Sequence, residues 1–206
     1  MKKNLTKAKT LEFINHNFKK YGIKKISIPT FIFFSKSDFL KNKKKIILEI
    51  KKKFKKKKII IRSSSLSEDN KNLSNAGKYL SIANLRPDSK FIEQIIEKVI
   101  NKFDSQKDQI LVQEFIDKTE MSGVIFTREA NYNSPYYVIN YDTSGKTNII
   151  TSGKNNTSIQ TEYIFRNKTD ISTKFKGFLK SVKILEKIMN SNRIDIEFAK
   201  KNNKWI

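Results

Sequence analysis

Apolar residues recur along this chain with two spacings, one typical of helices and one typical of strands. Between runs of lysine, Phe39, Ile46, Ile50 and Phe54 follow one another at steps of seven and four residues, which brings them to one side of a helix. Short apolar runs between polar or turn residues predict strands. The pattern predicts helices at residues 36–57, 87–103 and 172–190, and strands at residues 28–34, 59–61, 110–116, 122–127, 136–141, 147–151 and 194–199.

The order of these elements predicts an α+β protein with two lobes. Helices alternate with strands up to about residue 107, and short strands dominate after it. A chain of 206 residues fits one large domain or two small lobes, and 37% hydrophobic with 11% aromatic residues is a globular composition. We expect an N-terminal α/β lobe over residues 1–107, with a long polar loop at residues 62–80, and a mostly antiparallel lobe over residues 108–206.

The chain is strongly basic, with 43 Lys and Arg residues against 20 Asp and Glu residues and a net charge of +23. Such a charge can attract nucleic acid or another polyanion. Nearly all of it is lysine, however, whereas base readout relies on the forked contacts of Arg, Asn and Gln. Lys, Ile and Asn also share A/T-rich codons, which explains the bias without a ligand. Nucleic-acid binding is therefore disfavoured. The alternative that stays open is a non-catalytic polyanion binder, whose affinity would depend steeply on salt.

Two further features of the composition bear on the class of protein. Cysteine is absent, which excludes disulfides and thiolate metal sites. The N-terminal segment "MKKNLTKAKTLEFINH" lacks the apolar core of a secretory signal, and no apolar run approaches the length of a membrane span. The sequence therefore predicts a soluble, cytoplasmic protein with no membrane partner.

The strand "IDIEFA" at residues 194–199 carries the first candidate chemistry. Side chains alternate along a strand, so Ile194, Ile196 and Phe198 share the core face, and Asp195 and Glu197 share the other face about 6.6 Å apart. Mg²⁺ prefers one or two carboxylates together with substrate phosphates. The alternative is the solvent-facing side of an edge strand.

The stretch after the strand at residues 59–61 supplies the complementary chemistry. Arg62 presents a planar fork that fits phosphate oxygens, and Ser63, Ser64 and Ser65 add hydroxyl and backbone N–H donors. Gly77 permits close backbone approach. The alternative is an ordinary Ser- and Asn-rich surface loop. Together, the carboxylate strand and this loop favour a phosphorylated ligand with Mg²⁺.

These segments resemble a known family. "IIIRSSSLSEDNKNLSNAGKYLSIANL" (59–85) is similar to the Val-Arg-Ser-Ser-Ala…Glu-Asp…Ser-Phe-Ala-Gly…Asn-Val signature of the ATP-binding domain shared by phosphoenolpyruvate synthase and pyruvate phosphate dikinase. "ILVQEFI" (110–116), "MSGVIFTRE" (121–129) and "RIDIEFA" (193–199) resemble further motifs of that domain, in the same order. "LTKAKTLEFI" (5–14) is a weaker match to its N-terminal Gly-Lys-Gly segment.

The resemblance implies a two-lobed, ATP-grasp-like fold with Mg-ATP held between the lobes. It implies that Arg62 and Arg128 are catalytic: Arg62 holds phosphates together with the serine loop, and Arg128 stabilises charge on the transferring phosphates. Asp195 and Glu197 would hold Mg²⁺ or orient the phosphate chain. Gln113, Glu114, Phe115 and Ile116 would line the adenine pocket, largely through backbone groups. The implied nucleotide-binding set is Lys7, Arg62, Ser63, Ser64, Ser65, Glu68, Asp69, Gly77, Gln113, Glu114, Phe115 and Ile116.

The resemblance also implies partners. In the family, ATP phosphorylates a histidine on a swivelling domain, which delivers the phosphoryl group to pyruvate on a pyruvate-binding domain. The Thr-Ser-His motif of the swivelling domain is absent here, as is the pyruvate-binding barrel. We therefore expect a chain that binds Mg-ATP but does not complete phosphoenolpyruvate synthesis alone. It would be a fragment, one part of a split enzyme, a free-standing paralogue or a degenerate regulatory subunit.

Two departures from the family pattern concern the second lobe. The family's Gly-Leu-Gly-Glu segment has no clear counterpart, and "NYDTSGKTNIITSG" (140–153) occupies its place, with Lys146 near the position of the acidic residue. The sequence ends at "KWI", before the family's Leu-Gln-x-Arg strand, so this lobe is expected to lack its last strand.

Overall fold

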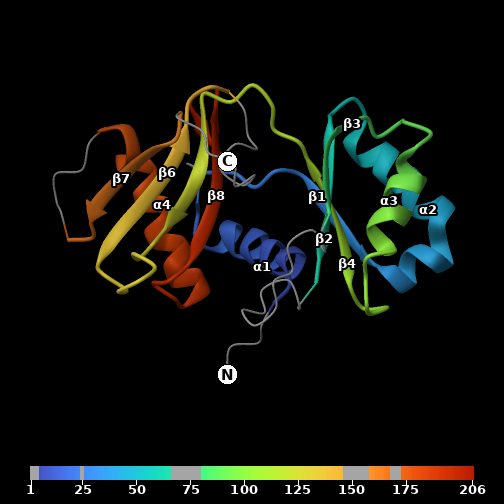
Figure 1. Cartoon of the computed structure of the whole chain (residues 1–206), viewed down its shortest axis with the longest axis horizontal. Coiled ribbons are helices and arrows are strands. Elements are labelled where there is room, and N and C mark those ends of the chain that lie inside the picture. The colour runs from blue at the N-terminus through green and yellow to red at the C-terminus, as the bar shows by residue number, and fades with distance from the viewer. Residues whose placement is uncertain (1–4, 24–25, 66–79, 146–157, 168–172) are drawn as a thin grey trace. The chain divides into compact units, whose positions relative to one another are not determined.

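The computed structural model of the chain describes residues 5–23, 26–65, 80–145, 158–167 and 173–206. Glu68, Asp69, Gly77, Lys146 and the strand predicted at residues 147–151 lie outside these residues. The described elements are α1 (Lys7–Lys20), β1 (Phe31–Ser35), α2 (Lys36–Phe54), β2 (Ile59–Ser64), β3 (Ser81–Leu85), α3 (Ile92–Ile100), β4 (Gln109–Glu114), β5 (Met121–Phe126), β6 (Tyr136–Asp142), β7 (Gln160–Phe165), α4 (Thr173–Met189), β8 (Asp195–Lys201) and β9 (Lys204–Trp205) (Figure 1).

The chain folds into two compact units, and the predicted α+β class is confirmed. The first unit comprises Met1–Phe13 and Pro29–Phe115, and the second comprises Ile14–Ile28 and Ile116–Ile206. Each unit contains one antiparallel sheet, and the chain passes from one unit to the other at three points.

The sheet of the first unit has the strand order β1-β4-β2-β3. Figure 1 shows α2 and α3 on the same face of this sheet. The apolar side predicted for α2 packs against the sheet. Its residues Phe39, Ile46, Ile50 and Phe54 are all buried in one core with isoleucines from β2 and β4. The lysines between them remain on the outer side of the helix, which is the ordinary arrangement of an amphipathic helix.

The start of α2 is fixed by a capping box. The hydroxyl of Ser35 accepts a hydrogen bond from the backbone N–H of Asp38 at 3.0 Å, and the Asp38 carboxylate accepts one from the backbone N–H of Ser35 at 3.1 Å. These bonds satisfy two donors at a helix end that would otherwise lack partners. The hydrogen bond from the Ser35 hydroxyl to the Asp38 carboxylate, and after it the one from the Ser35 backbone N–H, lower the pKa of Asp38. The predicted helix start at residue 36 follows from this cap.

The strand at Gln109–Glu114 belongs to the first unit rather than to a second lobe starting at residue 108. β4 is an inner strand of the first sheet, where it pairs with β1 on one side and β2 on the other. The units therefore divide after Phe115, and residues 14–28 join the second unit, where Ile26 forms a bridge with Trp205. The change in pattern near residue 107 marks the end of a helix, not the end of a unit.

The sheet of the second unit has the order β7-β6-β5-β8-β9, and α4 covers one of its faces. Four aromatic side chains form the centre of this core, Phe175 and Phe178 from α4 and Phe198 and Trp205 from the sheet. The rings of Phe178 and Trp205 stack with their centroids 4.6 Å apart. This packing holds the two carboxylate positions of β8 on the opposite face of the sheet.

Three of the described strands were not predicted, and β2 extends three residues further than predicted. β3, β7 and β9 lie at sheet edges and carry few buried residues, so their sequences lack a clear alternation. β2 continues past Arg62 to Ser64 because the backbone pairs with β4 there, although the side chains turn polar. Among the residues that the structure describes, no helix combines the length and the apolar content needed to cross a membrane.

Replacing Gly123 with Ala should destabilise the second unit. A Cβ atom at this position would lie 2.3 Å from the backbone oxygen of Asn140 and 2.7 Å from the ring of Phe198. We expect a loss of about 1–3 kcal/mol in the free energy of unfolding, measured by urea denaturation. Gly177→Ala is the matched control, since it sits inside α4 and a Cβ atom there would meet no neighbouring segment within 4 Å. It should gain about 0.5–1 kcal/mol. Equal effects of the two changes would contradict this account.

Candidate functional site

The Arg-Ser-Ser-Ser segment lies at the end of β2 in the first unit. Arg62 is half-buried, whereas Ser63, Ser64 and Ser65 are at most 3% exposed. The hydroxyl of Ser64 accepts a hydrogen bond from the backbone N–H of Ala8 at 2.9 Å, and the hydroxyl of Ser65 donates one to the carboxylate of Asp108 at 2.6 Å. These two hydroxyls therefore bind the segments that contain Ala8 and Asp108 to the end of β2, a role that the sequence did not reveal.

The hydrogen bond between Ala8 and Ser64 brings the N-terminus of α1 to the end of β2. α1 begins at Lys7, and its first turn is capped by the hydroxyl of Thr6, which accepts a hydrogen bond from the backbone N–H of Lys9 at 3.2 Å. The N-terminus of a helix carries a partial positive charge and favours anions. Lys7, the predicted nucleotide-binding lysine, is exposed and adjoins Ala8, which is bound to Ser64. The structure thus brings together Lys7 and the serine segment that follows Arg62.

Residues 113–116 comprise the last two residues of β4 and the two that follow it, and all four are half-buried. The backbone N–H of Glu114 donates to the oxygen of Thr30 at 2.8 Å, and that of Phe115 donates to the oxygen of Lys58 at 2.9 Å. The Glu114 carboxylate forms an ion pair with Lys57. The N–H groups of Glu114 and Phe115 and the Glu114 carboxylate are thus used within the first unit, and contact of residues 113–116 with adenine stays a prediction.

Asp195 and Glu197 occupy one face of β8 in the second unit, as the alternation predicts. Both are exposed, whereas Ile196 is half-buried and Phe198 is buried in the aromatic core. In register with them on β5 are Phe126 and Val124. Within the described part of the chain, no group of three or more His, Cys, Asp or Glu residues could hold a metal ion. Two carboxylate groups fit Mg²⁺ that takes its remaining ligands from phosphate and water.

Arg128 follows the end of β5, and its guanidinium group is only partly satisfied. One terminal nitrogen, Nη1, donates to the backbone oxygen of Asn133 at 2.9 Å, while the Nε atom is buried with no hydrogen-bond partner among the described residues. A buried donor of a charged group without a partner is costly. This donor is therefore suited to an anionic ligand.

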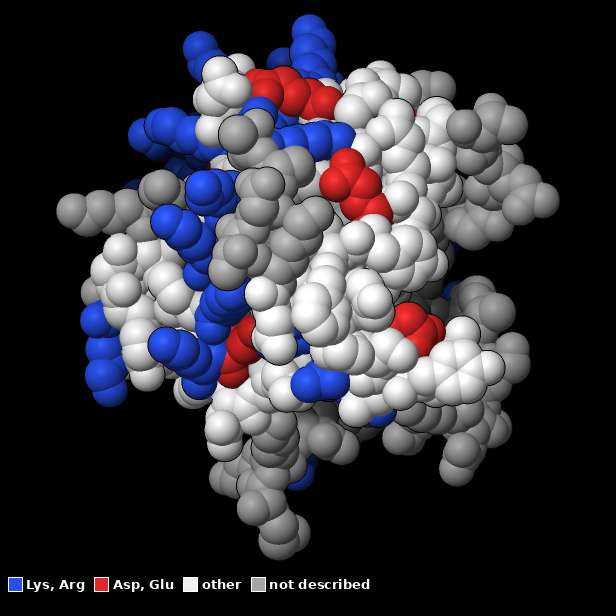
Figure 2. Space-filling view, turned by 90° about the vertical axis from the view of Figure 1, so that its left-hand side faces the viewer, with Lys and Arg blue, Asp and Glu red and all other residues white. Residues whose placement is uncertain are grey.

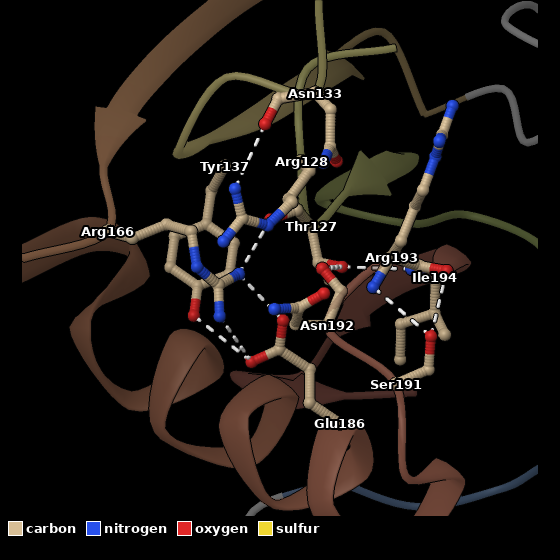
Figure 3. Close-up of polar contacts among 10 residues, drawn as sticks. All are labelled: Thr127, Arg128, Asn133, Tyr137, Arg166, Glu186, Ser191, Asn192, Arg193 and Ile194. Carbon is tan, nitrogen blue, oxygen red and sulfur yellow. Dashed lines mark hydrogen bonds and ion pairs between the residues drawn. The ribbon is translucent and has the colours of Figure 1, made fainter.

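A buried polar cluster next to Arg128 was missed by the sequence analysis (Figure 3). Arg166 forms a two-pronged ion pair with Glu186, with nitrogen–oxygen distances of 2.7 and 3.0 Å, and its guanidinium group lies over the ring of Tyr137. The hydrogen bond to Glu186 raises the pKa of Arg166. Arg166 also donates to the backbone oxygen of Thr127 at 2.6 Å. Its position after an unpredicted edge strand gave no signal in the sequence, and Glu186 looked like one polar residue on a helix.

Lysines form a stripe along α4. Lys176, Lys180, Lys183 and Lys187 follow one another at steps of four, three and four residues, so they lie on one side of the helix. Figure 2 shows Lys and Arg side chains gathered in a band on one side of the face that it presents. In a chain this rich in lysine, a solvated helix face accounts for the stripe. Polyanion binding stays a prediction.

The sequence matches a family model described as the AMP/ATP-binding domain of pyruvate phosphate dikinase. The match covers residues 33–142, more than half of the chain. This span contains the Arg62–Ser65 segment, the end of β4 and Arg128, and it ends before Asp195 and Glu197. A search of curated proteins finds no match.

Several solved structures are similar to this fold. They include the VanG D-Ala:D-Ser ligase of Enterococcus faecalis (12% identity, TM-score 0.47, covering 93% of this chain and 48% of that one) and a D-alanine–D-alanine ligase of Bacillus anthracis complexed with ATP (12%, 0.44, 95% and 53%). D-alanyl-alanine synthetase A of Vibrio cholerae is 11% identical, with a TM-score of 0.44, and the match covers 91% of this chain and 50% of that one. The chain thus spans about half the length of these proteins.

The buried phenol of Tyr137 should make stability fall at high pH. Burial is the main cause that raises the pKa of Tyr137 from 10.0 to about 12, and the Glu186 carboxylate adds to it. The unfolded chain then loses this proton first, so the stability from the group is complete below about pH 10 and is lost as the pH rises through about 12. Between about pH 9 and 12, the wild type should lose about 1–3 kcal/mol more unfolding free energy than Tyr137→Phe in urea denaturation. Parallel pH curves for the two proteins would contradict this expectation.

Proposed function

The chain belongs to the family of the pyruvate phosphate dikinase AMP/ATP-binding domain, and from this premise we propose that it binds ATP with Mg²⁺ and donates a phosphoryl group to a histidine on another domain. The observation that carries the proposal lies in the second unit. β5 leads to Arg128, whose buried Nε lacks a partner among the described residues, and the paired strand β8 presents two exposed carboxylates. A cation-binding strand beside an anion-binding guanidinium suits Mg-bound phosphates.

The proposed roles of the residues follow from their charges and positions. Arg62 and Lys7, with the N-terminus of α1, bind phosphate oxygens in the first unit, and Ser64 and Ser65 hold these segments in place. Glu68, Asp69 and Gly77 of the adjoining motif stay part of the proposed nucleotide set. Gln113 and Ile116, with the neighbouring Glu114 and Phe115, contact the base.

In the second unit, Asp195 and Glu197 would hold Mg²⁺, which neutralises charge on the phosphates when it is bound. Arg128 would bind the phosphate oxygens on which negative charge develops during transfer. Phosphoryl transfer needs little covalent help from the protein, so positioning and charge stabilisation by such groups account for most of the catalysis.

The acceptor of the phosphoryl group lies outside this sequence in our proposal. We infer a histidine on a swivelling domain, and a pyruvate-binding domain that uses the phosphohistidine, either in a longer chain or in a second protein. No Thr-Ser-His motif occurs in the 206 residues, and the part of the chain that the structure describes forms two antiparallel sheets rather than a barrel. The purified chain should therefore bind ATP without converting pyruvate to phosphoenolpyruvate.

Glu197→Gln should weaken magnesium-dependent binding of ATP. The substitution keeps the size of the side chain and removes one charged ligand, so we expect an affinity loss of roughly tenfold with Mg²⁺ and little change without it, measured by calorimetric titration. Glu120→Gln is the control, since Glu120 is another exposed carboxylate of the second unit and pairs with Lys200. Absence of wild-type binding at millimolar Mg-ATP would overturn the proposed function. Equal losses in the two variants would overturn the metal role of Glu197.

Arg62→Gln should weaken binding of ATP much more than binding of adenosine. The loss of a charge-assisted contact to phosphate is worth about 1.5–3 kcal/mol, or roughly tenfold or more in affinity. Arg86→Gln serves as control, because Arg86 lies in the same unit with a side chain that is 83% exposed, next to Asp88. Fluorescence or calorimetric titration with both ligands distinguishes the cases. The same loss for ATP and adenosine would remove Arg62 from the phosphate site.

A further inference from the structure

The ion pair between Arg166 and Glu186 is unusual for its place in the second unit. The side chains are 16% and 9% exposed, and they lie beside Tyr137, which is fully buried in the apolar core. Burying two charges is costly, and a buried pair is weak evidence for stability, because well-packed apolar residues often replace such pairs without loss. The contacts of Arg166 and Glu186 with the rest of the protein therefore point to a role other than stability.

The pair binds the backbone of Thr127. Nη1 of Arg166 lies 2.6 Å from the oxygen of Thr127 and 2.7 Å from Oε1 of Glu186, while Nη2 lies 3.0 Å from Oε2 of the same carboxylate. The carboxylate fixes the plane of the guanidinium group, and a second N–H of Nη1 donates to the Thr127 carbonyl, as the dashed contacts of Figure 3 show. Tyr137 contributes its ring below the guanidinium group, with its centroid 4.5 Å away.

Thr127 in turn binds the segment that leads into β8. Its backbone N–H donates to the oxygen of Ile194 at 3.0 Å, and its hydroxyl accepts from the N–H of Ile194 at 2.9 Å. The hydroxyl also donates to the oxygen of Asn192 at 2.9 Å. Thr127 is 0% exposed. Every polar group of this residue is thus used. Arg128 follows Thr127 along the chain, and Asp195 follows Ile194 and lies opposite Phe126 in the sheet.

We propose that Arg166 and Glu186 are positioning residues that fix Arg128 and Asp195 through Thr127. The pair touches neither of these side chains in the described contacts, and it acts by holding the backbone from which both project. This inference rests on the proposed function for what Arg128 and Asp195 do with ATP. The placement of their backbone can be tested without any nucleotide.

The test uses a variant that removes the pair without leaving a buried charge. In the double variant Arg166→Met/Glu186→Leu, apolar side chains of similar size fill the same space, and the Thr127 carbonyl loses its donor. Arg166→Lys is the second variant, because it keeps the positive charge but cannot bind Glu186 with two prongs and hold Thr127 as well. Glu162→Gln is the control, since Glu162 forms an ion pair with Lys174 in the same unit.

The first measurement is amide hydrogen exchange of the full chain without ligand. The double variant should speed exchange at the amides of Thr127 and Ile194 by tenfold or more, while the amides of Ile125 and Ile139 in the middle of the sheet keep their rates. Glu162→Gln should change neither set. Unchanged exchange at Thr127 and Ile194 would overturn the inference. If the double variant opens the whole sheet, Arg166→Lys decides by the same criterion.

The second measurement is titration with Mg-ATP in two backgrounds. Removing the pair should weaken binding at least tenfold in the wild-type background, and by a smaller factor in an Arg128→Gln background, because the part of the effect that acts through Arg128 disappears with its guanidinium group. Equal losses in both backgrounds indicate a merely structural role and overturn the inference. Absence of wild-type binding overturns the proposed function instead, and the exchange rates then decide the placement by themselves.

Discussion

The antiparallel register between β5 and β8 is the constraint on which the candidate site of the second unit depends. Phe126 lies opposite Asp195 and Val124 lies opposite Glu197, so both carboxylates share a face that α4 does not cover. Side chains alternate with a period of two, and a slip of one residue would turn both carboxylates into the aromatic core. Gly123 supports the register, because it is the partner of Phe198 and leaves room for the ring.

The aromatic core of the second unit also explains why the buried polar groups next to it are paired with one another. Rings from Phe175, Phe178, Phe198 and Trp205 exclude water from one side of the sheet, and polar groups that are buried there need partners within the protein. Thr127 satisfies its N–H, carbonyl and hydroxyl groups with backbone atoms and with Arg166. The end of β5 is therefore held by hydrogen bonds on several sides, while the neighbouring Arg128 keeps one buried donor without a protein partner in the described residues.

In the first unit, the serine segment Ser63–Ser65 contributes both to the fold and to the proposed phosphate site. Three hydroxyl side chains are buried at the end of β2, and at least two of them bind other segments, the first turn of α1 and Asp108. Burial of hydroxyls is costly without such partners. The segment thus serves the fold directly, by attaching α1 to the sheet, and it serves the proposed phosphate site indirectly, because that attachment brings Lys7 to the strand end that contains Arg62.

The sequence by itself determined the α+β class, the long amphipathic helices and the shared face of Asp195 and Glu197, because each of these depends on spacing within one segment. It also carried the family motifs, because they are contiguous. Only the tertiary structure decided that β4 belongs to the first sheet, that Ser64 binds Ala8, and that Arg166 and Glu186 meet at Thr127. These contacts join residues that are 20 or more positions apart, and local periodicity carries no information about which distant strands pair or which buried polar groups satisfy one another.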